Sequence, residues 1–217
     1  MGAPRKSKCA VPRLPAPLRK NDAFFMHGAI RTPPSVYAYA QDTVEVVHGP
    51  ACNPEVEIRL KQCKRDGVRV VPRRGGGGTV VLSPGTVVIV VVGCRGKGED
   101  VHALFSRIHA PIIATLNALL PTAVEERGLS DLAVDGRKIL GSSLYLSRKP
   151  ALFFYQASLM VNNDLALLDR YLEHPPREPD YRCGRSHRLF CTTLEELGVK
   201  CGAKEIAERL AREIRTF

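Results

Sequence analysis

The longest apolar run in this chain requires a fold that buries a strand on both faces. Every residue from Thr86 to Val92 is β-branched, and β-branched side chains favour extended backbone over helix. The run lacks any alternation of polar and apolar residues, which is typical of a strand covered on both sides. It is also far shorter than the roughly 20 apolar residues of a membrane-spanning helix. We therefore predict a soluble protein built around a sheet, without a membrane partner.

The order of the other elements favours an α+β protein. Periodicity and turn signals predict strands at 35–40, 68–71, 80–82, 132–134, 138–146 and 152–161, and helices at 53–66, 99–120, 164–171, 192–197 and 204–215. The first of these helices has an apolar stripe of Val56, Leu60 and Cys63. A mixed, mostly antiparallel sheet flanked by helices fits this order better than alternating βαβ units.

The N-terminal segment differs in composition from the rest of the chain. Residues 1–21 are basic and rich in proline, so we predict a disordered tail before one domain that spans 22–217. The tail lacks the apolar centre of a secretory signal, and we predict a cytoplasmic protein. The whole chain has 32 Lys and Arg against 22 Asp and Glu, a formal net charge of +10. This excess favours a polyanionic partner, which includes nucleic acids, nucleotides and acidic protein surfaces.

The cysteines predict neither disulfides nor a metal site. The chain has 7 cysteines, an odd number, and no export signal, so disulfides are not expected. No Cys-x-x-Cys pair occurs, and the spacing of Cys183, Cys191 and Cys201 is too wide for a zinc knuckle. We predict no metal bound by protein ligands alone, and we expect most of the cysteines to be small buried residues.

A glycine-rich loop lies between two predicted strands. It consists of Arg73 and Arg74 followed by four glycines and Thr79. Without Cβ atoms, its backbone can approach a bulky ligand closely and point N–H groups at it. The two arginines suit a phosphate or a carboxylate. The loop is not a Walker A motif, because no Gly-Lys-Ser/Thr follows. The alternative to a ligand-binding loop is a flexible turn with two arginines that have no functional role.

A second informative segment surrounds Lys138. This lysine follows the tight turn predicted at Asp135-Gly136 and begins a strand, a position that can hold an ammonium group rigidly. Gly141 and the small residues after it leave space for a ligand alongside. Alone, the segment is equally consistent with a hairpin that carries an exposed lysine.

Together, the two segments resemble the lipoate–protein ligase A family, which belongs to the biotin/lipoate ligase superfamily of cofactor transferases. The family pattern is Arg-Arg-x-Gly-Gly-Gly, followed further along by Gly-(Arg/Lys)-Lys-Ile-x-Gly-Ser, and both parts occur here in that order. Weaker similarity covers residues 158–165 and 181–194, with Gln41 and Glu55 upstream. The resemblance implies the biotin/lipoate-ligase catalytic fold over most of the chain.

The resemblance also implies an activity. Lipoate, or a related short acyl cofactor, would be joined to a lysine of an acceptor protein through an acyl-adenylate formed from ATP with Mg²⁺. Lys138 is the implied catalytic residue, contacting first the substrate carboxylate and then the acyl-adenylate. The implied ATP- and adenylate-binding residues are Arg73, Arg74, Gly78, Thr79 and Val80. The implied acyl-binding residues are Gly76, Gly77, Gly141 and Ser142.

The implied acceptor is an acidic lipoyl domain, which the positive charge of this chain would attract electrostatically. The sequence also departs from the family pattern. Ser130-Asp131 stands in place of the usual Asn-Asp pair, and Tyr155-Gln156 in place of a histidine pair. We expect no C-terminal accessory domain after the catalytic domain, and a separate accessory subunit could supply its part in adenylation.

Two rival functions remain open. Octanoyltransferases share the fold, use no ATP and hold octanoate from acyl carrier protein as a cysteine thioester. Cys183-Gly184 followed by Thr193-Leu194 resembles one branch of them, so Cys183 is a candidate nucleophile.

A non-enzymatic module that binds nucleic acid or a lipoyl domain is the alternative of another class. Because aromatic residues make up only 6% and tryptophan is absent, we expect no nucleic-acid partner.

Overall fold

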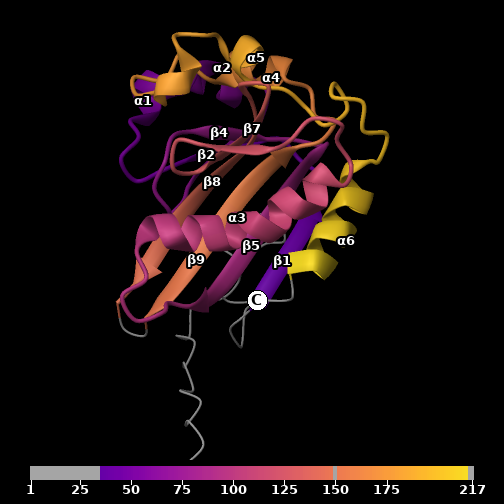
Figure 1. Cartoon of the computed structure of the whole chain (residues 1–217). Helices are drawn as coiled ribbons and strands as arrows, with labels where there is room; N and C mark the ends of the chain where they lie inside the picture. The colour runs from indigo at the N-terminus through magenta and orange to yellow at the C-terminus, as the bar shows by residue number, and fades with distance from the viewer. Residues whose placement is uncertain (1–34, 149–150, 215–217) are drawn as a thin grey trace, which may run out of the picture.

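The larger of two sheets forms the centre of the molecule (Figure 1). The computed structural model describes residues 35–148 and 151–214, so the predicted tail over 1–21 lies outside it. The six strands have the order β1-β5-β9-β8-β7-β6, and every neighbouring pair is antiparallel. They are β1 (Ser35–Ala40), β5 (Thr86–Cys94), β6 (Glu125–Arg127), β7 (Asp131–Val134), β8 (Arg137–Ser147) and β9 (Leu152–Met160).

The smaller sheet has the order β3-β2-β4. Its strands are β2 (Glu45–His48), β3 (Arg69–Pro72) and β4 (Val80–Leu82); β2 is parallel to β3 and antiparallel to β4. The predicted α+β class with a mixed, mostly antiparallel sheet is therefore confirmed. Strand β2 was not predicted, because it is short and starts on a charged residue. That residue, Glu45, is buried and lies 3.2 Å from Arg69 across the sheet.

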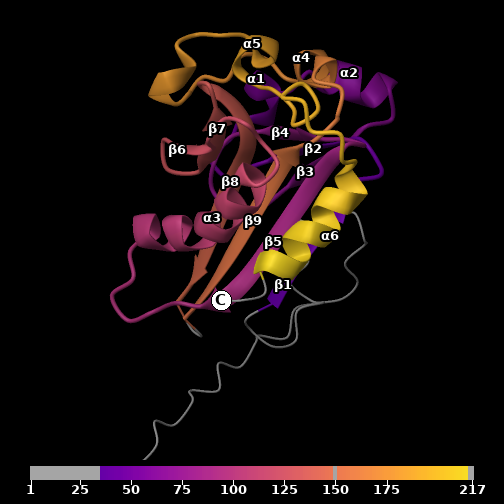
Figure 2. The same ribbon diagram turned by 45° about the vertical axis from the view of Figure 1, so that its right-hand side comes forward.

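Strand β5 is buried on both faces, as its β-branched run predicts. On one face, Val87, Ile89 and Val91 pack in a core with helices α3 (Val101–Asn117) and α6 (Ala203–Glu213). On the other face, Val88 and Val90 pack with residues of the smaller sheet. Figure 2 shows α6 lying along β1 and β5. The sheet thus occupies the middle of a layered structure, and every residue of β5 before Cys94 is buried.

The remaining helices gather beside the smaller sheet, at one end of the central sheet (Figure 1). They are α1 (Pro54–Glu57), α2 (Leu60–Arg65), α4 (Ala166–Tyr171), α5 (His187–Phe190) and the short 3₁₀ helix Asp180–Arg182. The prediction of one helix over 53–66 is wrong. Ile58 is extended and forms a β-bridge with Leu172, which separates α1 from α2. The expected apolar stripe fails as well, because Val56 is 52% exposed.

The predicted helix over 192–197 is also absent, since that segment forms turns. Its backbone is bonded to the central sheet: the N–H of Thr192 donates to the carbonyl of Lys138, and that of Leu194 donates to the carbonyl of Met160. These hydrogen bonds to distant residues of the central sheet form in place of the helical hydrogen bonds that the local sequence predicts. The predicted helix over 99–120 is α3, which runs through Pro111.

Of the six described cysteines, only Cys63 and Cys191 are buried, so the expectation that most are buried is wrong. Within residues 35–148 and 151–214, no helix is both long enough and apolar enough to cross a membrane.

Candidate active site

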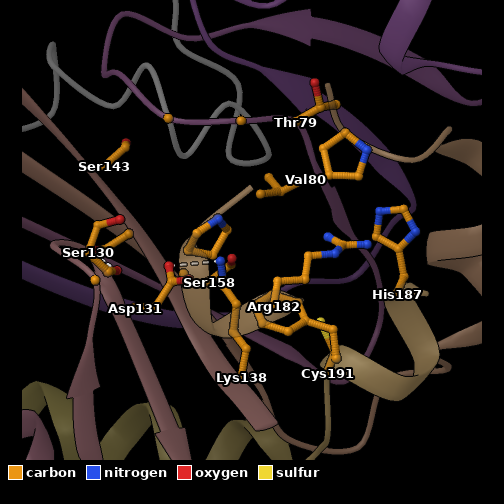
Figure 3. Close-up of a pocket in the computed structure, with 18 of the residues that line it drawn as sticks. Thr79, Val80, Ser130, Asp131, Lys138, Ser143, Ser158, Arg182, His187 and Cys191 are labelled. Carbon is orange, nitrogen blue, oxygen red and sulfur yellow. Dashed lines mark hydrogen bonds and ion pairs between the residues drawn. The ribbon is translucent and has the colours of Figure 1, made fainter. Parts of the chain in front are cut away.

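A pocket of about 250 Å³ opens where the glycine loop, β8, β9 and residues 175–191 meet (Figure 3). Most of the predicted site residues line it, namely Arg73 and residues 77–80 of the loop and β4, and Lys138, Gly141 and Ser142 of β8. The chain therefore brings together two segments that lie about sixty residues apart. Arg74, Gly76 and Cys183 do not line this pocket.

Arg73 holds the glycine loop in shape. Its side chain is buried, and its Nη2 donates to the carbonyls of Gly76 at 2.8 Å and Gly78 at 2.7 Å. Its Nη1 donates to the carbonyl of Val47 in β2 at 3.3 Å. Burial lowers the pKa of Arg73 to about 10, so the guanidinium stays charged at neutral pH. The loop needs glycine at position 77, where φ is +93°.

Arg74 is not among the residues that line the pocket. Arg73 and Arg74 follow the end of β3 at Pro72, and Arg74 lies in a bend of the chain. Arg74 is exposed, and its guanidinium carbon lies 6.0 Å from the ring centroid of Tyr145. Gly76 contributes its carbonyl to Arg73 instead of lining the pocket.

Lys138 extends into the pocket from the start of β8 (Figure 3). Its Nζ lies 2.8 Å from Oδ1 of Asp131, and the other oxygen of Asp131 accepts a hydrogen bond from the Tyr181 hydroxyl at 2.9 Å. Burial and the negative charge of Asp131 raise the pKa of Tyr181, which keeps this hydroxyl protonated. A Cβ at Gly141 would come within 2.8 Å of Nζ, so the glycine makes room for the lysine. The ammonium group is thus held in place.

Thr79 is fixed by a residue that the sequence reasoning missed. Its hydroxyl donates to Oε2 of Glu57 at 2.8 Å, and Oε1 of Glu57 accepts from the backbone N–H of Asn53 at 3.0 Å. Glu57 lies at the end of α1 and is buried. No local signal identifies it, because its partner is 22 residues away.

The thiol that lines the pocket belongs to Cys191 and not to Cys183. Cys183 is exposed, has a left-handed backbone with φ of +52°, and donates from its Sγ to the carbonyl of Asp180 at 3.2 Å. The left-handed turn ends the 3₁₀ helix and directs this side chain outward. Cys191 is buried, and this burial raises the pKa of its thiol to about 11.

Positive charge dominates the pocket lining. Five lysine and arginine side chains line it: Arg73, Arg127, Lys138, Arg177 and Arg182. Among the described residues, Asp131 is the single acidic residue in the lining. His187 also lines it, and burial together with the charge of Arg182 lowers the pKa of this histidine, which favours its neutral form. A pocket of this composition suits an anionic ligand.

Within the described part of the chain, no three His, Cys, Asp or Glu side chains are placed to bind a metal ion.

The family relationship follows from a profile match over almost the entire chain. Residues 19–215 match the model of the family described as "Lipoyl protein ligase A/B catalytic domain". The chain belongs to this family. The resemblance inferred from the glycine loop and the Lys138 segment is therefore confirmed. Arg182 and Asp131, which line the pocket of this lipoyl-ligase-family domain, were not among the site residues that sequence reasoning selected.

Relatives of this lipoyl-ligase-family domain include a lipoate–protein ligase of Streptococcus pyogenes serotype M5 (strain Manfredo). It is 29% identical over 159 residues, which are 73% of this chain and 44% of the relative. The chain thus spans less than half of that curated relative's length.

Solved structures share the fold of this domain. The bipartite lipoate protein ligase of Thermoplasma acidophilum, described with its E2 lipoyl domain, has a TM-score of 0.71 at 22% identity, covering 83% of this chain and 69% of that chain. A lipoate–protein ligase A bound with ATP has a TM-score of 0.69 at 22% identity, covering 83% and 70%. The LipL1 protein of P. falciparum, in complex with lipoate, has a TM-score of 0.65 at 20% identity, covering 89% and 51%. The expected catalytic fold of biotin and lipoate ligases is confirmed.

Proposed function

We propose that this domain attaches lipoate, or a closely related acyl group, to a lysine of an acceptor protein through an acyl-adenylate formed from ATP. The observation that carries the proposal is the Lys138 ammonium, which is held beside a glycine loop in a pocket lined by four further cationic side chains. Family membership supports it, as do the names of relatives described with ATP and with lipoate.

The residues of the pocket suit both half-reactions. In the first, a carboxylate oxygen of the acyl acid attacks the α-phosphate of ATP, pyrophosphate leaves, and negative charge develops on the phosphate oxygens. In the second, an acceptor amine attacks the acyl carbonyl, AMP leaves, and charge develops on the carbonyl oxygen. A fixed ammonium such as that of Lys138 offsets the charge in each step. Gly78, Thr79 and Val80 would border the adenylate, and Gly77, Gly141 and Ser142 the acyl chain.

Arg73 serves this proposal indirectly. Its hydrogen bonds go to carbonyls of the loop and of β2, so its role is to fix the loop around the ligand. A loop that is already ordered loses less conformational entropy when the ligand binds. Arg74, which is exposed, contributes to the positive surface that an acidic acceptor would meet.

Magnesium fits this site as a companion of the triphosphate. The Asp131 carboxylate lines the pocket and offers the hard oxygen that Mg²⁺ prefers, and Mg²⁺ sites commonly use one carboxylate together with substrate phosphates and water. The ion, when bound, would offset phosphate charge. Asp131 would then exchange part of its contact with Lys138 for contact with the ion.

The proposed acceptor is an acidic lipoyl domain. The net charge of +10 would steer such a domain toward the pocket, and the archaeal relative is described with an E2 lipoyl domain. That relative is bipartite, so a second polypeptide is a candidate partner for adenylation here too.

The direct test is mass spectrometry of an apo lipoyl domain after incubation with this protein, ATP, Mg²⁺ and lipoate. We expect a mass increase that matches one lipoyl group and depends on ATP. A parallel reaction contains octanoyl carrier protein without ATP, and both reactions are repeated with a candidate accessory domain. If no acyl-adenylate forms from lipoate, octanoate or biotin in any of these mixtures, the ligase proposal is wrong.

Replacing Cys183 with serine is expected to leave acyl attachment within a few-fold of wild type, because the Cys183 thiol is exposed and outside the pocket lining. Cys191→Ser is the companion variant, since this thiol lines the pocket. Because burial raises the pKa of the Cys191 thiol, the thiolate is a minor form at neutral pH, which disfavours Cys191 as a nucleophile. An acyl thioester trapped on either cysteine in the absence of ATP would favour the octanoyltransferase reaction.

A further inference from the structure

Arg182 is a buried cation in the pocket to which neither the sequence motifs nor the proposed reaction assigns a role. It ends the 3₁₀ helix Asp180–Arg182, its residue exposure is 5%, and it lines the pocket. Figure 3 shows its guanidinium extending into the space between Lys138 and His187. A charge this deeply buried is costly unless something pairs with it.

The hydrogen bonds of Arg182 fix its side chain but do not use all of its N–H donors. Its Nε donates to the carbonyl of Arg185 at 2.9 Å and lies 3.3 Å from Oε2 of Glu178. Its guanidinium carbon lies 4.9 Å from the ring centroid of Phe190. Its Nη2 atom is covered by protein and has no hydrogen-bond partner within residues 35–148 and 151–214. The group is therefore rigid and lines the pocket, and its protein partners do not satisfy all of its N–H donors.

Glu178 neutralises Arg182 only in part. This carboxylate also lies 3.1 Å from His174 Nε2, and it accepts a hydrogen bond from the backbone N–H of Gly184 at 2.7 Å. Its charge is thus shared among three groups. Lys138 differs, because its Nζ is in close contact with the carboxylate of Asp131 inside the pocket. Of these two cations, Arg182 is the one whose charge is less fully offset by its own protein partners.

We propose that Arg182 donates from its guanidinium to an anionic oxygen of the bound ligand, and so makes the pocket select acids over their neutral analogues. This inference rests on the proposed function, which supplies two such oxygens: the carboxylate of the acyl substrate and the phosphate of the nucleotide. Both spread negative charge over oxygens that a planar guanidinium binds well. Because the guanidinium is already held by Phe190 and Arg185, little side-chain entropy is lost on binding.

The experiment measures affinities by calorimetry for two matched pairs of ligands. The first pair is lipoate and the neutral lipoamide, and the second is AMP and the neutral adenosine. Each is titrated into wild type, Arg182→Met, Arg182→Gln and Arg188→Met. Arg188 is the matched control, since its side chain is 58% exposed and lies 3.9 Å from Glu196 on the surface.

We expect wild type to prefer the acid in at least one pair. Loss of one charge-assisted hydrogen bond should reduce that preference about 10- to 100-fold in Arg182→Met and leave the neutral ligand unaffected. If the preference for lipoate over lipoamide falls, the oxygen that Arg182 binds belongs to the carboxylate. If the preference for AMP over adenosine falls, that oxygen belongs to the phosphate. Arg188→Met should retain the wild-type preference.

Three outcomes would overturn the inference. If Arg182→Met keeps the full acid preference, Arg182 does not bind the anion, although the proposed function stands. If both Arg182 variants also lose affinity for the neutral ligands, the role of Arg182 is to maintain the structure of the pocket and not to bind the anion. If wild type binds none of the four ligands, the proposed function itself fails, and the inference fails with it.

Discussion

Replacing Lys138 with methionine is expected to lower acyl attachment at least 100-fold while the protein remains folded. Methionine keeps the length and much of the packing of the lysine stem. It removes the positive charge at the oxygens where negative charge develops in both half-reactions. Loss of one such group in other enzymes lowers the rate about 10²- to 10³-fold. The rate of acyl transfer to a lipoyl domain, followed by mass spectrometry, measures the effect.

The matched control for this variant is Lys204→Met, which removes an exposed lysine from α6. It should retain wild-type activity. The Lys138 variant should lose some stability, because Asp131 keeps only its hydrogen bond from Tyr181, so thermal unfolding is measured for both proteins. A folded Lys138→Met protein that acylates normally would mean that Lys138 takes no part in catalysis.

Replacing Arg73 with methionine is expected to have the largest effect on stability. Its guanidinium donates to three backbone carbonyls, and the variant leaves these carbonyls without those donors. A hydrogen bond to a charged group contributes about 1.5–3 kcal/mol, so we expect a loss of at least about 3 kcal/mol in the free energy of unfolding. Urea unfolding followed by circular dichroism measures this loss.

Arg74→Met is the adjacent control for this experiment. Arg74 is exposed and has one distant contact with the ring of Tyr145, so the expected change is within about 0.5 kcal/mol. Equal effects of the two substitutions on stability would contradict the assignment of Arg73 as the residue that holds the glycine loop.

The elements that could be predicted from sequence are those whose own residue pattern is sufficient to indicate their structure. The β-branched run of β5 predicts a strand covered on both faces, and helices on one side with the smaller sheet on the other provide that cover. Asp135-Gly136 predicts the turn between β7 and β8, and Asp135 has the positive φ that such a turn requires. The glycine loop and Lys138 could be recognised because the residues with the proposed roles are themselves part of the unusual local sequences.

Features that depend on distant partners could not be predicted. Ile58 continues a helical pattern but pairs with Leu172, and that pairing breaks the helix. Glu57 looks like an ordinary surface charge in the sequence, yet it is buried and accepts a hydrogen bond from Thr79, 22 residues further along the chain. Arg73 and Arg74 appear equivalent in sequence, and only the direction of the backbone at the end of β3 distinguishes them. For Ile58 and Glu57, the contact that decides the structure is non-local.

The bond between Thr192 and the Lys138 carbonyl has a consequence for the timing of synthesis. All the strands of the central sheet are complete once Met160 has been made, but Cys191 and Thr192, which lie against β8 beside Lys138, follow some thirty residues later. Because a nascent chain begins to fold from its N-terminal part, the sheet can assemble before the far wall of the pocket exists. A ribosome that stalls between these two points releases a polypeptide with its lysine in an unfinished pocket. Under the proposed function, acyl transfer would therefore require the chain to have been made at least as far as Thr192.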